Sequence, residues 1–211
     1  MITFLKIQPL LRPFRRFLRE ERGAILAETV IVLPVLFWAY LGSYVYFDAF
    51  STKNTAMRAT YTIADLISRQ TNTLTPSDIE GMNKVFDFIT AAPRRGFTTH
   101  IRVTDVSYDL KKKIYLVNWS DATRGNTALS NADINNYADR LPNLALGDSE
   151  IMVESWESFT PAFNIGLSEK NFYNTVIVRP RMSPNVAFQG NGNGGGGNGN
   201  EHGKGHEDSN S

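Results

Sequence analysis

Apolar and polar positions divide the chain into segments of different period. From Ala24 to Phe47 nearly every position is apolar, and Glu28 is the one charged residue among these 24. A helix rises about 1.5 Å per residue, so this run extends about 36 Å, against a hydrocarbon core of about 30 Å. The pattern therefore predicts a transmembrane helix over residues 24–47. A buried core helix is the alternative, although core helices rarely contain so long an uncharged run.

Helical spacing continues beyond the apolar run. Apolar residues recur on one face up to about Gln70, which predicts that the helix extends out of the membrane as an amphipathic segment. Thr75 and Pro76 then have the pattern of an N-cap followed by proline at the first helical position, and helical spacing runs on to a break at Pro93. We expect a second, shorter helix between these points.

The period changes to that of strands at Thr98. Apolar side chains occupy odd positions at Ile101 and Val103 but even positions from Val106 onward, which indicates a bulge or bend in that strand. After a charged turn, residues 114–119 are apolar on both faces, as expected of a central strand. These two segments are predicted to form an antiparallel hairpin.

Three further segments complete the predicted domain. Ser130 and Asp133 are expected to cap a short helix that Pro142 closes, and residues 150–159 and 172–179 have strand character. A long N-terminal helix, short helices and about four antiparallel strands predict an α+β fold.

Charge and glycine are distributed unevenly, although the formal net charge is only +1. The leader over residues 1–23 carries six basic and two acidic side chains, whereas the domain over residues 48–189 is neutral. The positive-inside rule predicts that the basic leader stays in the cytoplasm and that the domain lies on the opposite side of the membrane. Nine of the 16 glycines fall in the tail over residues 190–211, which has too few apolar residues to offset its ordering entropy and is predicted to be disordered.

The junction between the leader and the apolar run is the most specific feature. A carboxylate one turn inside a membrane helix costs roughly 2.5 to 3.5 kcal/mol on insertion scales, so Glu28 needs a partner. The stretch RGAILAETVIVLPVL, which starts at Arg22, resembles the prepilin-type N-terminus of the TadE/TadG-like minor pilins (pseudopilins) of the tight-adherence, or Flp, pilus system. The phrases VESWESFTP and VIVRPR are similar to the carboxyl-terminal signature of the same group.

The resemblance implies a set of roles and partners. A prepilin peptidase would cut between Gly23 and Ala24, and Glu28 would pair with the new terminal amine of another pilin or pseudopilin subunit. The resemblance also implies a pilin-like form of the α+β fold, contacts with membrane lipid and with the pilus assembly platform, and a location in the inner membrane or the pilus with the domain in the periplasm. Thr29 departs from the pattern, because many such pilins have Phe or Tyr there.

Each of these residues also has a simpler interpretation. Glu28 could lie at headgroup level and pair with Arg19 or Arg22, and Gly23 could be an ordinary interfacial glycine. Pro34 removes one backbone hydrogen bond and is expected to kink the helix, either harmlessly or as a hinge.

Residue types that carry catalysis and metal binding are sparse. The chain has no cysteine, which removes disulfides, thiol catalysis and Cys-ligated metals. His100 is the one histidine outside the tail, and its alternation with apolar neighbours predicts that it faces water. His202 and His206 lie in the tail without preorganisation. We therefore expect no enzyme activity, no cofactor, no metal site and, since the domain is neutral, no nucleic-acid partner.

Two functions remain open. One is a structural or assembly component of a tight-adherence pilus. The other is a permanently membrane-anchored extracytoplasmic binding module, in which the span is only a tether. An anchored hydrolase is a third and more distant alternative.

Overall fold

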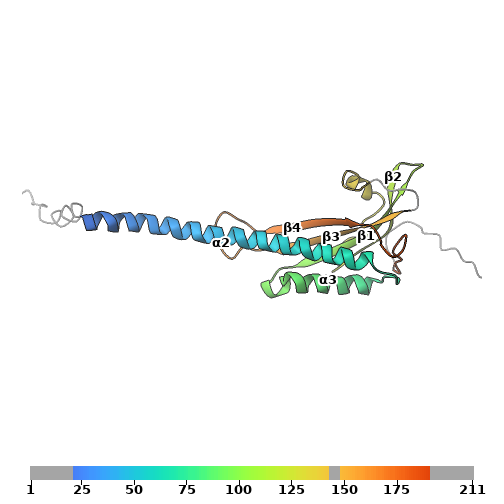
Figure 1. Ribbon diagram of the computed structural model, residues 1–211, viewed down its shortest axis with the longest axis horizontal. Helices are drawn as coiled ribbons and strands as arrows, with labels where there is room; N and C mark the ends of the chain where they lie inside the picture. The colour runs from blue at the N-terminus through green and yellow to red at the C-terminus, as the bar shows by residue number, and fades with distance from the viewer. Residues whose placement is uncertain (1–20, 143–147, 191–211) are drawn as a thin grey trace, which may run out of the picture. The chain divides into compact units, whose positions relative to one another are not determined.

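The computed structural model describes residues 21–142 and 148–190, with the backbone alone for residues 21–24. A long helix and a shorter helix are followed by a four-stranded antiparallel sheet (Figure 1). This arrangement confirms the expected α+β class. The predictions for the leader up to residue 20 and for the tail beyond Gly190 lie outside the described residues.

The long helix α2 (Glu21–Ser68) covers 48 residues. It contains the whole predicted span and ends close to the predicted end at Gln70. The chain divides into two compact units, and α2 belongs to the first unit up to Phe50 and to the second unit from Ser51. Side chains of α2 in the first unit are largely exposed, whereas the second unit buries one face of the helix.

Small residues form much of the buried face of α2 in the second unit. Ala56, Ala59 and Ala64 are buried there together with two isoleucines, and all five belong to the main core cluster with residues of the sheet. Because alanine side chains are short, the helix backbone can approach the strands closely. The hydroxyls of Thr60 and Ser155 share a buried hydrogen bond of 2.7 Å, which joins α2 to the sheet directly.

The shorter helix α3 (Pro76–Thr90) begins as predicted. Thr75 is its N-cap, and a capping box forms because the Asp78 N–H donates to the Thr75 hydroxyl while the Asp78 carboxylate accepts from the Thr75 N–H. The hydrogen bonds from Thr75 lower the pKa of Asp78. Ile79 and Phe86 point from α3 into the main core. A short 3₁₀ turn, η1 (Ala92–Arg95), follows the helix.

Four strands form the sheet in the order β2-β1-β3-β4, with every neighbouring pair antiparallel. The strands are β1 (Thr99–Asp109), β2 (Ile114–Ala122), β3 (Ser149–Phe159) and β4 (Lys170–Val178). The predicted hairpin is β1 with β2. Odd-numbered residues of β1 and β3, such as Ile101 and Val153, face the helices, and even-numbered residues face the opposite side.

The expected bulge is present, but its extra residue lies on the partner strand. The register between β1 and β2 shifts between Asp105 and Val106, where Asn118 of β2 is skipped. β1 itself pairs with β3 without interruption. The parity change in β1 has another cause: the helices cover its odd positions in the first half, and a coil segment covers its even positions in the second half.

The prediction that residues 114–119 form a central strand is wrong, because β2 lies at the edge of the sheet. Trp119 faces the helix side, where its indole N–H donates to the Val186 carbonyl at 2.8 Å and its ring stacks on Phe188 at 4.6 Å. Tyr115 and Val117 face the opposite side and are buried there. Both faces of this edge strand are therefore apolar because segments outside the sheet cover them.

The sheet face opposite the helices is covered only in part. Val106, Val117 and Met152 form a second core cluster with residues of the connection between β2 and β3. That connection contains the predicted short helix, which is a 3₁₀ turn, η2 (Ile134–Tyr137), without a side-chain cap.

Glu157 is a buried carboxylate on the helix side of β3. Its side chain is fully buried, and neither of its oxygens has a hydrogen-bond partner in the described part of the chain. Burial raises the pKa of Glu157 to about 7, against the opposing positive charge of Arg95 and with a further contribution from Asp87.

We expect Glu157→Gln to stabilise the full-length protein at about pH 8 and to change its stability little at about pH 4.5. Between pH 4.5 and about 7 the folded state keeps the proton that the unfolded state releases, so wild-type stability falls as the pH rises through this window. The gain at high pH should be on the order of 2 kcal/mol. Urea unfolding in detergent micelles measures it, with the exposed Glu169→Gln as control. Equal stability of variant and wild type at pH 8 would contradict the raised pKa.

Candidate functional site

The residues predicted to act at the junction all lie on one uninterrupted helix. Gly23, Ala24, Glu28 and Pro34 fall within α2, which continues through the proline. Gly23 and Glu28 are five positions apart, about 7.5 Å along a helix axis. The predicted cleavage position is therefore helical, and a peptidase would have to unwind the helix locally to reach it. A glycine makes this easier, since it destabilises a helix by about 1 kcal/mol relative to alanine.

Glu28 is exposed, and it is the one charged residue of the largely apolar stretch from Ala24 to Phe47. Ile25, Ile31 and Val32, about one turn away, are exposed as well. The sequence offers no basic residue between Ala24 and Phe47, so a cationic partner for Glu28 must come from beyond this stretch. The alternative partners Arg19 and Arg22 lie outside the described side chains.

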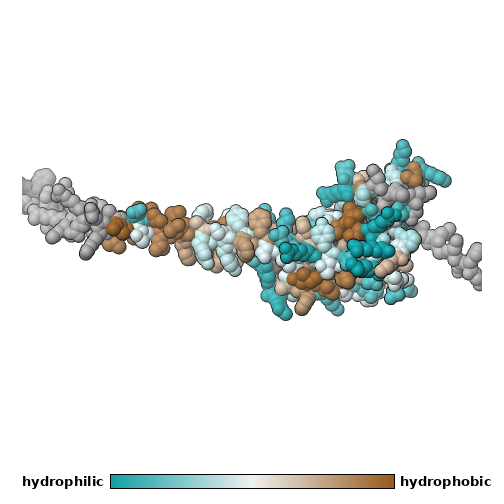
Figure 2. Space-filling view, viewed as in Figure 1, coloured by the Kyte–Doolittle hydropathy of each residue, from teal (hydrophilic) through white to brown (hydrophobic). Residues whose placement is uncertain are grey.

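Apolar side chains surround α2 on all sides along this stretch. The exposed fractions reach 71 % at Val30, 64 % at Trp38 and 74 % at Phe47, and Figure 2 shows hydrophobic colour along this part of the helix. In the part of the chain that the structure describes, α2 is the one helix long and apolar enough to cross a membrane. The hydroxyls of Thr29 and Ser43 donate to carbonyls of the preceding turn at 2.8 and 2.9 Å, which satisfies these groups within the helix.

A loop between β3 and β4 packs on α2 within the first compact unit. The ring of Phe163 meets Tyr44 edge to face with centroids 6.4 Å apart. At Gly42 the helix has no side chain, and a Cβ there would lie 3.9 Å from a methyl group of Ile165. The sequence does not predict this contact, because nothing in the loop's own pattern indicates which helix turn it meets.

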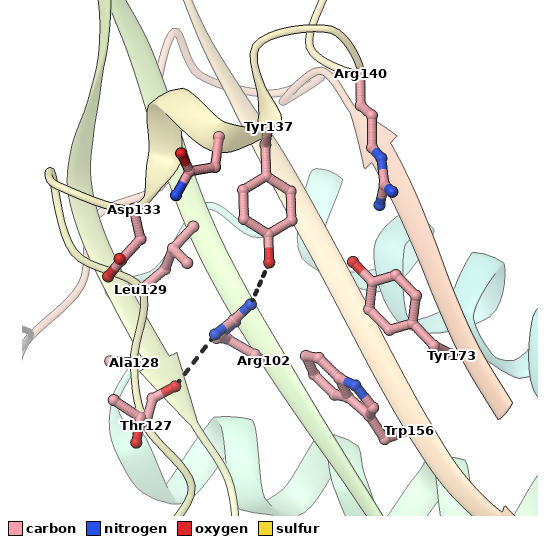
Figure 3. A pocket seen from close by; sticks show the side chains of 10 residues that line it. Arg102, Thr127, Ala128, Leu129, Asp133, Tyr137, Arg140, Trp156 and Tyr173 are labelled. Atoms are coloured by element: carbon pink, nitrogen blue, oxygen red, sulfur yellow. Dashed lines mark hydrogen bonds between the residues drawn. The ribbon is translucent and has the colours of Figure 1, made fainter. Parts of the chain in front are cut away.

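A cavity of about 570 Å³ opens on the face of the sheet opposite the helices. Figure 3 shows that strand residues Arg102, Trp156 and Tyr173 form one wall. The other wall comes from the connection between β2 and β3, with residues from Thr127 to Arg140. The sequence does not predict this cavity, since the residues of its two walls are at least 16 positions apart in the chain.

A fully buried carboxylate, Glu154, connects the strand residues that line the cavity. Glu154 accepts hydrogen bonds from Arg102 Nε and from the Tyr173 hydroxyl, both at 2.6 Å. Arg102 also donates to the Tyr137 hydroxyl at 3.1 Å and to the Thr127 carbonyl at 3.4 Å. One ion pair thereby links three strands to the connection that covers them.

The same contacts determine the protonation of their members. Desolvation lowers the pKa of Arg102, but the hydrogen bond and the charge of Glu154 more than compensate, and the net shift is upward. Burial and the hydrogen bond to Glu154 raise the pKa of Tyr173. The guanidinium therefore stays charged and the phenol stays protonated, so both remain donors to Glu154.

Three aromatic rings form a row across the strands beside this network. His100, Trp156 and Tyr173 occupy paired positions in β1, β3 and β4. The His100 and Trp156 rings stack at 4.6 Å, and Trp156 lies 5.1 Å from Tyr173. His100 lies on the sheet face away from the helices, as its alternation predicts, but it is only partly exposed to water because its ring stacks on Trp156. Burial, followed by the charges of Arg102 and Arg124, lowers its pKa.

The residues of the carboxyl-terminal phrases have different environments. Trp156 belongs to the cavity, whereas Arg179 forms an ion pair with Asp148 and Arg181 one with Asp65 at 3.4 Å. Within the described ranges, no cluster of three or more His, Asp or Glu side chains could hold a metal ion. His202 and His206 lie outside those ranges.

We expect Glu154→Ala to destabilise the protein by about 3 to 5 kcal/mol, because it leaves the nearly buried Arg102 guanidinium without its counter-ion. Glu154→Gln keeps an acceptor for Tyr173 and should lose less. Urea unfolding of the full-length chain in micelles measures both, with Glu169→Ala at an exposed position as control. A loss in Glu154→Ala no larger than in the control would show that the ion pair is dispensable.

Comparison of the chain with protein-family models, with curated proteins and with solved structures found no match. Two features of the chain itself therefore bear on its function: the exposed apolar stretch of α2 with its single carboxylate, and the cavity on the sheet.

Proposed function

We propose that this protein is a membrane-anchored structural subunit, a TadE/TadG-like minor pilin that takes part in assembly of a tight-adherence pilus. The observation that carries the proposal is α2 itself. One helix supplies both a largely apolar stretch of membrane-spanning length, in which Glu28 is the one charged residue, and the face that packs on an antiparallel sheet.

In the proposed mechanism, the basic leader keeps the N-terminus in the cytoplasm and the domain reaches the periplasm. Prepilin peptidase hydrolyses the peptide bond between Gly23 and Ala24, which leaves a carboxylate on the leader and a new amine on Ala24. That amine carries a positive charge at neutral pH, as the α-amino pKa is about 7.7 to 8.0. It can neutralise Glu28 of a neighbouring subunit inside the membrane.

Exposure along the apolar stretch supports lateral assembly. Side chains such as Val30, Leu36 and Phe37 are free to contact either lipid or a neighbouring helix. Lipid is as apolar as these side chains, so packing alone discriminates weakly between the two. The Glu28 ion pair favours contact with a neighbouring subunit over contact with lipid. An unpaired carboxylate in lipid costs free energy, and pairing with an amine reduces that cost.

A permanently anchored binding module is the second candidate. The observation in its favour is the cavity on the sheet, which is built around a buried ion pair and has no part in the span. In this case α2 is a tether, and Glu28 has no partner in a second subunit.

Sequencing of the mature N-terminus tests the processing step. We expect protein extracted from the membranes of piliated cells to begin at Ala24, while Gly23→Val should retain the leader because a β-branched residue at the cut hinders local unwinding and access. Intact mass spectrometry provides the second measurement. Wild-type protein that keeps its leader while pili are present would overturn the proposed cleavage.

Exchange of the membrane carboxylate separates the two candidate functions. Glu28→Gln should insert normally but lose about tenfold or more of its co-purification with other pilin-like subunits, because the amide cannot form the ion pair. Glu28→Asp should retain part of it, and Lys53→Gln, an exposed charge change on the same helix, should retain all of it. Unchanged co-purification of Glu28→Gln would favour the tether.

A further inference from the structure

The sheet face opposite the helices is closed at one end and open at the other. The connection between β2 and β3 buries Val106, Val117 and Met152 at the closed end. At the open end, the row of His100, Trp156 and Tyr173 is only half-buried. The cavity lies where the covering connection stops, so aromatic rings and polar groups from both walls meet there (Figure 3).

The charges around this cavity balance one another. Arg102 is matched by the buried Glu154, and the lining contains one further cation, Arg140, and one further anion, Asp133. Arg140 lies over the Tyr137 ring at 6.0 Å, and Asp133 accepts a hydrogen bond from Ser130 at 2.6 Å. The formal charge of these four residues is zero, which favours a neutral ligand over an anion or a cation.

The lining combines two kinds of surface. Trp156 and Tyr173 offer aromatic rings, and Leu129 adds an apolar side chain. Asn136, Asp133 and Arg140 add an amide, an acceptor and a donor, within a volume in the range typical of ligand sites, about 300 to 1,000 Å³. A ligand that fits needs apolar C–H faces and, beside them, groups that both donate and accept hydrogen bonds.

We propose that this cavity is a binding site for a neutral saccharide. A sugar ring has a C–H face that packs on an aromatic ring, where the weakly positive hydrogens meet the negative face of the π-system. Its hydroxyls both donate and accept, which matches the mixture of Asp133, Asn136 and Arg140. Glu154 accepts hydrogen bonds from Arg102 and Tyr173 and so fixes the positions of both side chains in the cavity wall. Because Arg102 is neutralised by Glu154, the pair presents no net charge to the ligand.

This site is independent of the pilus proposal. Its residues lie on the sheet and on the connection between β2 and β3, and none belongs to α2. A subunit in a pilus and a tethered module could each present it. The test therefore does not depend on cleavage at Gly23 or on Glu28.

The test uses full-length protein in a detergent without a sugar headgroup, because alkyl glycosides would compete. The probes are maltotriose, cellotriose and triacetylchitotriose, followed by saturation-transfer NMR and calorimetry. We expect at least one of them to bind with a Kd of about 1 mM or tighter. Trp156→Ala should weaken that binding by about tenfold or more, and Phe88→Ala, which removes an 80 % exposed ring from α3, should leave it unchanged.

Arg140→Ala provides a second variant at an exposed position outside the sheet, in case Trp156→Ala fails to fold. It should weaken saccharide binding several-fold while the circular dichroism spectrum stays as in the wild type. Phosphate and glutamate serve as competing probes. The proposal is overturned if none of the trisaccharides binds at about 10 mM, if Trp156→Ala and Arg140→Ala bind as well as wild type, or if only the anions bind and Arg140→Ala abolishes their binding.

Discussion

The two faces of the sheet place unequal demands on this chain, and most of its architecture follows from that constraint. Helices α2 and α3 cover one face, so most of its buried side chains are apolar, and Ser155 shares a hydrogen bond with the Thr60 hydroxyl of α2. Among the described residues, the opposite face is covered by the connection between β2 and β3. Where that cover ends, the strands carry Arg102, Glu154 and Tyr173, which hydrogen-bond to one another, and Arg102 also donates to Tyr137 of η2.

A buried ion pair on a sheet face costs free energy, because both charges lose their hydration. Proteins in which hydrophobic residues of the same volume replace a buried ion pair are often as stable or more stable. Stability alone therefore does not explain why this pair is present. Its geometry offers a reason, because Arg102 reaches across to the Tyr137 hydroxyl and so ties the covering connection to the strands. Glu157, on the other face, shows the cost of a carboxylate that lacks such partners: its pKa rises to about 7.

The helix α2 has two parts with different surroundings along its length. Its C-terminal part has three alanines and two isoleucines in the core that it shares with the sheet, and the short alanine side chains allow a close approach of the helix backbone. Its N-terminal part has large apolar side chains on every side, which water does not favour and a bilayer does. A single carboxylate in such a surface is the feature from which a specific partner can be inferred, and the pilus proposal rests on it.

The sequence by itself determined the features that depend on neighbours along the chain. The length and apolar character of α2, the Thr75 cap of α3 and the turn between β1 and β2 all follow from local patterns of period and capping. Strand order, the edge position of β2 and the surroundings of His100 depend on segments far away in the chain. The cavity is of this second kind: only tertiary pairing brings Trp156 beside His100 and Arg140 above the sheet, because no local period records which strands become neighbours.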